Sequence, residues 1–183
     1  MTARILCLIV LLLEVRGLSL SLPDRKWKAL VFYTQLSNLV TAVFALLLAL
    51  LGQPPWVTVL RYLRSCMLVM TFFVTTCVLI PMGGDPQKLL WSGNGLYHHV
   101  LCPVLSTASY LFVEAHSGMV WLPVLVTFVY GMTMLVLNGI RKVDGPYPFF
   151  RVRNQSALAT VLWMVVLMVV MTGISAGVWT LAG

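Results

Sequence analysis

The stretch ALATVLWMVVLMVVMTGISAGVWTL, residues Ala157–Leu181, decides the fold class of this chain. It carries no charged residue and, as a helix, is long enough to cross the ~30 Å hydrocarbon core of a bilayer. Five more apolar stretches of similar length precede it: Ile5–Leu22, Ala29–Leu51, Val57–Ile80, Leu96–Val113 and Met119–Leu137. The pattern predicts an all-α integral membrane protein, a bundle of six transmembrane helices that forms a single domain over residues 1–183.

The composition agrees with this prediction. Hydrophobic residues make up 60% of the 183 residues and charged residues only 9%, whereas a soluble domain is about a quarter charged. Short turns rich in Gly and Pro separate the apolar stretches, which leaves no room for a soluble catalytic domain. The first stretch contains Glu14 and Arg16, so we expect a retained helix with protein neighbours rather than a signal peptide.

The net charge of +7 is explained by membrane topology better than by nucleic-acid binding, because the basic residues do not form a patch interleaved with aromatics. If the helices alternate, one face of the membrane receives Arg25, Lys26, Lys28, Lys88, Arg141, Lys142, Arg151 and Arg153, and the other receives Arg4, Arg61 and Arg64. Basic loops favour the cytoplasmic side. We therefore predict a multi-pass protein with cytoplasmic basic loops, both termini outside, and Trp27 anchored at the basic face.

One face of the second stretch is polar. Thr34, Ser37, Asn38 and Thr41 follow helical spacing, so they share a side of the helix. Interhelical hydrogen bonding is the simpler interpretation of such a stripe. The alternative is the wall of a pocket near the basic face.

Two adjacent histidines, His98 and His99, open the fourth stretch, with Asn94 one turn earlier. Consecutive side chains of an α-helix diverge by about 100°, so only one ring is expected to face the bundle centre. Both rings could instead mark the membrane interface. A metal site is not expected, because the remaining histidine, His116, lies at the far end of this stretch. No cofactor motif is present.

Helix geometry places these groups in one layer. Thr34 lies about 9 Å below the start of its helix at 1.5 Å per residue, and His98 begins a helix that enters from the same side. We expect an apolar cavity between them, walled by Thr34, Ser37, His98 and Cys102. The connection Gly145–Phe150, which contains Tyr147, returns to this side and is expected to cap the cavity.

Three motifs in this order, Thr34–Phe44, Asn94–Pro103 and Tyr147–Phe149, resemble the androgen-induced and androgen-dependent transmembrane hydrolases and their six-helix bacterial relatives. The likeness covers about residues 27 to 150. It implies an intramembrane threonine hydrolase that cleaves fatty acid esters of hydroxy fatty acids or similar lipid esters. The family's catalytic threonine and histidine fall on Thr34 and His98.

The chain also departs from the animal members of this family. Trp27 and Lys28 lie about one turn further upstream of the threonine, and the connection Gly52–Trp56 is much shorter. The pair Ser37 and Asn38 resembles the bacterial branch. The resemblance therefore implies the fold more strongly than the substrate.

The implied chemistry assigns His98 as the general base for the Thr34 hydroxyl. Asn38 and Asn94 are candidate donors to the oxyanion. The basic rim, particularly Lys28, Lys88 and Arg151, is a candidate for holding a substrate carboxylate, with topology and contact with anionic lipid headgroups as the simpler interpretation. Membrane lipids and a lipid ester substrate are the expected partners, without nucleic acid. A small transporter or channel and a non-catalytic membrane scaffold are the competing hypotheses.

Overall fold

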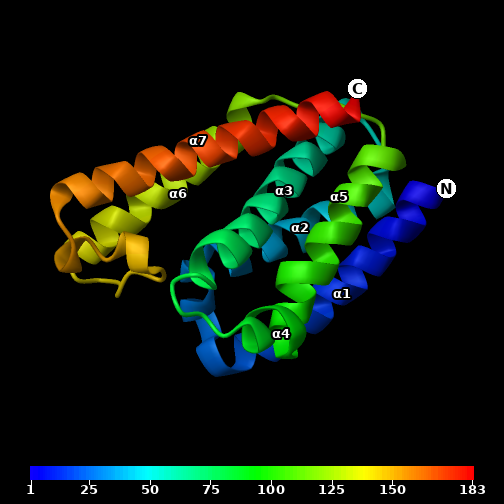
Figure 1. The fold of residues 1–183 in the computed structure, drawn as a ribbon. Helices are drawn as coiled ribbons and strands as arrows, with labels where there is room; N and C mark the ends of the chain where they lie inside the picture. The colour runs from blue at the N-terminus through cyan, green and yellow to red at the C-terminus, as the bar shows by residue number, and fades with distance from the viewer.

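The computed structural model describes the backbone of residues 1–183 and all side chains except those of Asp24, Arg25 and Trp27. Every regular element in the described chain is helical, which confirms the expected all-α class (Figure 1). The expected membrane-face positions of Arg25 and Trp27 fall outside the described side chains.

The helices follow one another with short connections. The first part of the chain forms α1 (Thr2–Arg25), η1 (Lys26–Val31), α2 (Tyr33–Leu51), α3 (Pro55–Val74) and η2 (Thr75–Leu79). The middle part forms η3 (Gln87–Trp91), α4 (Gly93–Gly95), η4 (Leu96–Leu101) and α5 (Cys102–Phe112). The last part forms α6 (Trp121–Gly139), η5 (Pro148–Phe150), η6 (Val152–Asn154) and α7 (Ala157–Ala182).

Five segments of this structure are long and apolar enough to cross a membrane: Thr2–Pro23, Tyr33–Leu51, Pro55–Leu79, Trp121–Gly139 and Ala157–Ala182. The sixth expected span, Leu96–Val113, is helical but divides into η4 and α5. The backbone keeps right-handed helical angles across the junction, where Leu101 has φ −65° and ψ −51°. The division therefore reflects a change from π-helical to α-helical hydrogen bonding, which an apolar pattern does not encode.

Helix α3 is the centre of the bundle. It packs against α2, α5, α6 and α7, while α1 packs against α2 and α5. Its side chains Tyr62, Met67 and Leu68 are fully or almost fully buried. In contrast, α7 exposes many large apolar side chains, including Leu158 and Val169.

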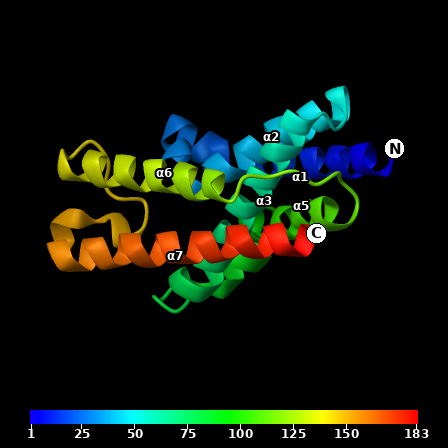
Figure 2. The ribbon, with the colours of Figure 1, turned by 90° about the horizontal axis from the view of Figure 1, so that it is seen from above.

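The two ends of the bundle differ in what they carry. Both chain termini lie at one end, and α4 and the connection between α6 and α7 lie away from it (Figure 1). Helices α6 and α7 form an antiparallel hairpin beside the other helices (Figure 2). The connections that carry most of the basic residues are thus remote from the termini, as an alternating topology requires.

Candidate functional site

A cavity of about 430 Å³ lies at the end of the bundle remote from the termini. Its polar lining comes from α1, from α2, from η3 to η4 and from the connection between α6 and α7: Ser21, Thr34, Gln35, Lys88, Asn94, His99 and Tyr147. The Lys88 side chain is 82% exposed, so the basic group stands at the mouth. The volume lies within the range of small-molecule sites in proteins.

Three π-helical segments surround this end of the bundle: η2, η3 and η4. Leu79 of η2, Lys88 and Leu89 of η3, and His99 of η4 all line the cavity. Short π-helical turns are rare and are found often at functional sites. Their occurrence together around one cavity singles out this end of the molecule.

Thr34 occupies the first turn of α2, where backbone N–H groups lack partners within the helix. Its backbone N–H donates to the hydroxyl of Tyr147 over 3.2 Å, and its own hydroxyl shares a hydrogen bond of 3.2 Å with the same group. Tyr147 is held by ring stacking on Phe149, with centroids 5.2 Å apart. The loop after α6 therefore fixes the Thr34 hydroxyl.

Thr34 also borders a second space, a narrow crevice of about 30 Å³. Apart from Thr34, Tyr147 and a few other polar groups, the lining of this crevice is apolar: Met70, Val74, Leu79, Phe149, Phe150 and Leu167. Thr34 and Tyr147 are shared by both spaces. The threonine hydroxyl thus stands where a polar cavity meets an apolar crevice.

His99 faces the cavity, and one of its ring nitrogens is already engaged. Its Nδ1 lies 2.6 Å from the carbonyl oxygen of Leu89. A carbonyl only accepts, so Nδ1 carries the hydrogen, and in the neutral ring Nε2 keeps the basic lone pair. The neighbouring backbone therefore sets the tautomer of a histidine that lines the same cavity as Thr34.

His98 is enclosed on the other side of η4. Its Nδ1 lies 3.2 Å from the amide nitrogen of Gln35, whose oxygen accepts a hydrogen bond of 2.8 Å from Ser21. Its Nε2 lies 3.9 Å from the carboxylate of Glu14. Among the described side chains, no hydrogen bond joins the Thr34 hydroxyl to either His98 or His99.

Both histidines are buried, but only His99 lines the cavity, whereas His98 faces Gln35 and Glu14. The expected cavity lining is corrected. Thr34 lines the cavity, whereas Ser37, His98 and Cys102 lie behind it.

The remaining candidates divide into two groups. Lys88 and Asn94 line the cavity with Thr34 and Tyr147. The amide of Asn38 instead donates to the carbonyl oxygens of Thr34 and His98, at 2.6 and 3.5 Å. Ser37 bonds with Thr71 of α3 at 3.0 Å. Asn38 and Ser37 thus tie α2 to its neighbours, which fits the interhelical interpretation of their stripe.

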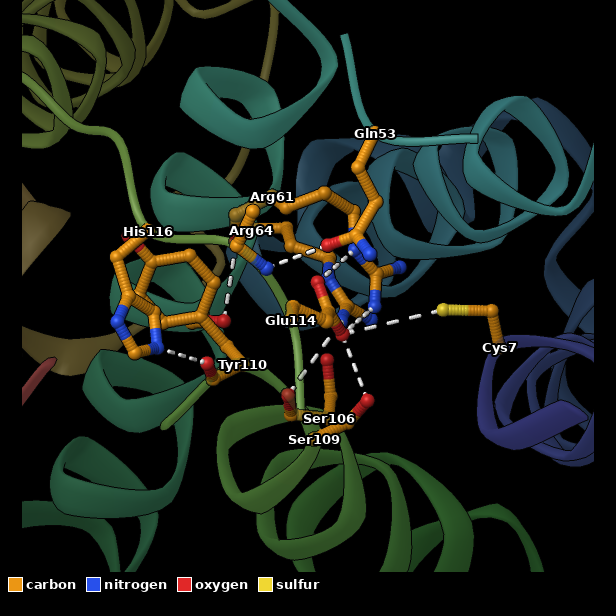
Figure 3. Close-up of polar contacts among 11 residues, drawn as sticks. Cys7, Gln53, Arg61, Arg64, Ser106, Ser109, Tyr110, Glu114 and His116 are labelled. Carbon is orange, nitrogen blue, oxygen red and sulfur yellow. Dashed lines mark hydrogen bonds and ion pairs between the residues drawn. The ribbon is translucent and has the colours of Figure 1, made fainter. Parts of the chain in front are cut away.

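A second polar centre lies toward the termini, around Glu114 (Figure 3). Both oxygens of this carboxylate accept from Arg61, and Oε1 also accepts from Ser109 over 2.6 Å and from Arg64 over 3.2 Å. The sequence suggested that both arginines mark a membrane face, but they are fully buried within α3. The sequence signal for this shared burial was the spacing of the two arginines by three residues, which places them on one face of the helix.

Glu114 lies two residues after the end of α5, and its surroundings shift its pKa in a definite direction. Burial raises the pKa of the carboxyl, but the hydrogen bonds from Arg61 and the charges of both arginines outweigh this, so the pKa lies below its ordinary value. Glu114 is therefore a carboxylate held by two guanidinium groups. It secures the connection between α5 and α6.

Comparison with family models, with curated proteins and with solved structures finds no match to this chain. The basis for a function is therefore the geometry of the cavity around Thr34 and of the polar centre around Glu114. Glu14 and Gln35 lie near Thr34 and His98, and sequence reasoning did not assign either of them to the site. It singled out His99 only as the neighbour of His98. Glu14 carried a signal, because a carboxylate within an apolar stretch is costly.

Proposed function

We propose that this chain is an intramembrane lipid ester hydrolase with Thr34 as the nucleophile. The observation that carries the proposal is the position of Thr34, which lines both a polar cavity and a narrow, mainly apolar crevice. An ester bond in a lipid has the same character, with a polar group on one side and an acyl chain on the other. The substrate class is fatty acid esters of hydroxy fatty acids or similar lipid esters.

The proposal includes insertion in a membrane by six spans. Five are the long apolar segments, and the sixth is the helical segment 93–112, which α4, η4 and α5 form together. The cavity then lies near the basic face, which we place in the cytoplasm because basic loops favour that side. Substrate would enter laterally from the lipid, and Lys88 at the mouth would hold an anionic group. Water would reach the cavity from the same face.

The chemistry runs in two balanced steps. The Thr34 oxygen attacks the ester carbonyl carbon, its proton passes to a histidine nitrogen, and that proton then leaves with the alcohol product. Water next attacks the acyl-threonine and gives its proton to the same nitrogen, and the fatty acid departs as Thr34 is restored. The Tyr147 hydroxyl and the Asn94 amide are the donors that we assign to the oxyanion.

The base belongs to the histidine pair, and the geometry favours His99 over His98. His99 lines the cavity with a basic Nε2, whereas the two nitrogens of His98 face Gln35 and Glu14. A base must come within about 2.6–3.2 Å of the proton that it takes. His98, the base that the family resemblance implies, would have to leave Gln35 to do so.

Hydrolysis of a lipid ester by the purified protein in mixed micelles tests the proposal. Thr34→Ala should reduce hydrolysis to background, and Thr34→Ser should retain part of it because the hydroxyl stays. Ser37→Ala is the matched control, since Ser37 lies on the same helix face but behind the cavity. Hydrolysis at the wild-type rate by Thr34→Ala would remove Thr34 as the nucleophile.

The choice of base has its own comparison. His99→Gln should abolish hydrolysis, and His98→Gln should leave a measurable rate. A double variant of Thr34→Ala with His99→Gln should be scarcely worse than either change alone, because nucleophile and base act as a unit. Full loss in His98→Gln with activity kept in His99→Gln would return the role of base to His98.

One observation favours a second function, the transport of ions or small solutes. Glu14, Arg61 and Arg64 are fully buried within α1 and α3, and ionisable groups at membrane depth often line proton or ion pathways. Proton flux into liposomes that contain the protein would measure this function. Flux that depends on Glu14, without hydrolysis of any lipid ester, would support transport over catalysis.

A further inference from the structure

Glu14 is the residue of this molecule whose position is hardest to explain by packing alone. It lies within the apolar helix α1 and is fully buried, and neither carboxylate oxygen has a hydrogen-bonding nitrogen or oxygen partner among the described residues. A carboxylate in such a place is costly unless another group compensates for its charge. The Nε2 of His98 lies toward it at 3.9 Å, the Cys102 thiol also faces it, and the charge of Arg64 acts on it from further away.

Gly17, one turn after Glu14 on the same helix, makes room for the same ring. A Cβ atom on Gly17 would lie 2.4 Å from Nε2 of His98 and 2.6 Å from Cδ2. Any side chain there would displace the imidazole. Two residues of α1 therefore fit one histidine, since Gly17 admits the ring and Glu14 faces its nitrogen.

The opposite edge of the ring is held by α2. Gln35 reaches Nδ1 of His98 with its amide nitrogen, and Ser21 fixes the amide through its oxygen. With Nδ1 as the acceptor, the neutral ring of His98 carries its hydrogen on Nε2, toward Glu14. Gln35 directly follows Thr34, so this arrangement links α1, η4 and the start of α2.

We propose that Glu14 and His98 form a positioning pair that sets the rotation of η4, so that the adjacent His99 presents Nε2 to Thr34. The inference rests on the proposed hydrolase function for its effect on rate. A π-helical turn is rare and departs from ordinary α-helical hydrogen bonding, and contacts on both sides hold η4 in this conformation. Glu14 and Gly17 hold His98 from one side, and the Leu89 carbonyl holds His99 from the other.

The test combines Gly17→Ala, which displaces the ring, with Glu14→Gln, which keeps the shape and replaces the carboxyl group with an amide. Gly173→Ala of α7 is the matched control, because a Cβ there meets nothing within 4 Å. Nitrogen NMR of the histidine rings in the full chain reports which nitrogen of His98 and His99 carries hydrogen. Hydrolysis rates report kcat and KM for the same variants.

In Gly17→Ala, the ring signals of both histidines should shift, and kcat should fall by about 100-fold with little change in KM, as small misplacements of catalytic groups do. Glu14→Gln should give shifts of the same sign with a smaller loss of kcat, and Gly173→Ala should resemble the wild type. Glu14→Gln reports on the pair even where Gly17→Ala fails to fold, because it adds no bulk.

The result that overturns the pair is an unchanged His99 ring signal in both α1 variants. Shifted ring signals in a protein that hydrolyses no ester would support the pair and reject the hydrolase. Unshifted signals with normal ester hydrolysis would reject the pair and support the hydrolase. The positioning role and the proposed function therefore fail in different ways.

Discussion

The two polar centres of this bundle are built in opposite ways. Around Glu114, buried donors from α3 and α5 converge on one carboxylate. Around Thr34, the polar groups line a cavity of about 430 Å³ and several of them face space that a ligand could fill. The comparison teaches that burial of charge alone does not mark a reactive site. Polar groups that converge on a cavity mark it better.

The largest effect on stability is expected when the closed centre loses its carboxylate. Glu114→Ala leaves Arg61 and Arg64 buried without their partner, and breaking a buried ion pair by removing one member costs about 3–5 kcal/mol. Unfolding of the detergent-solubilised protein by increasing SDS measures this loss. Thr34→Ala should change the same transition far less.

An exposed ion pair is the matched control for Glu114→Ala. Arg153 pairs with Asp144 over 3.2 Å at the surface of the connection between α6 and α7, where solvent screens the interaction. Arg153→Ala should leave the unfolding transition where it is. A Glu114→Ala protein as stable as Arg153→Ala would break the comparison, because the closed centre would then contribute nothing to stability.

Acid should weaken the closed centre next most strongly. The folded pKa of Glu114 lies below the ordinary value of 4.5, so its contribution to stability is complete above that value and is lost as pH falls through the folded pKa. Wild-type unfolding should therefore move to lower SDS concentrations below about pH 4.5. Glu114→Gln should show a smaller acid-dependent change, and equal slopes for the two proteins would contradict the assignment.

A smaller effect is expected at the contact between Thr34 and the loop after α6. Tyr147→Phe keeps the stacked ring and removes the hydroxyl that bonds twice to Thr34, which costs about 1 kcal/mol of stability. Hydrolysis should fall more than stability does, because the nucleophile loses its fixed orientation. Tyr33→Phe, which removes a hydroxyl bonded to Thr127 at 2.8 Å, is the control for losing a buried tyrosine hydroxyl.

The smallest structural effect belongs to the mouth of the cavity. Lys88→Gln should leave unfolding unchanged, because Lys88 is exposed and its contact with Asp85 is 3.9 Å long. For ester substrates with a free carboxylate it should raise KM, and for neutral esters it should not. Equal KM values for both substrate classes would remove Lys88 from substrate binding.

The sequence predicted the long apolar helices well, because length and hydropathy set them locally. The expected Ala157–Leu181 is α7 within one residue, and Met119–Leu137 is α6 within two at each end. The sequence did not predict η4, because π and α hydrogen bonding suit the same residues. That local change decides which histidine reaches the cavity.

The second failure concerns charges. An alternating arrangement of the helices assigns Arg61 and Arg64 to the membrane face opposite the basic loops. Their partner, Glu114, is 50 residues or more away in sequence, so the pairing depends on how α3 and α5 pack. The sequence did select Thr34, Lys88, Asn94 and Tyr147, which the structure brings to one cavity.

The position of the cavity at the end remote from both termini has a consequence for the bilayer itself. With the proposed activity, each turnover replaces one lipid with two smaller amphiphiles in the leaflet next to the cavity. The opposite leaflet gains none, so the two monolayers come to differ in area. In giant vesicles that contain the protein in one orientation, the membrane should then curve so that the leaflet that gains area is on the convex side as substrate is consumed.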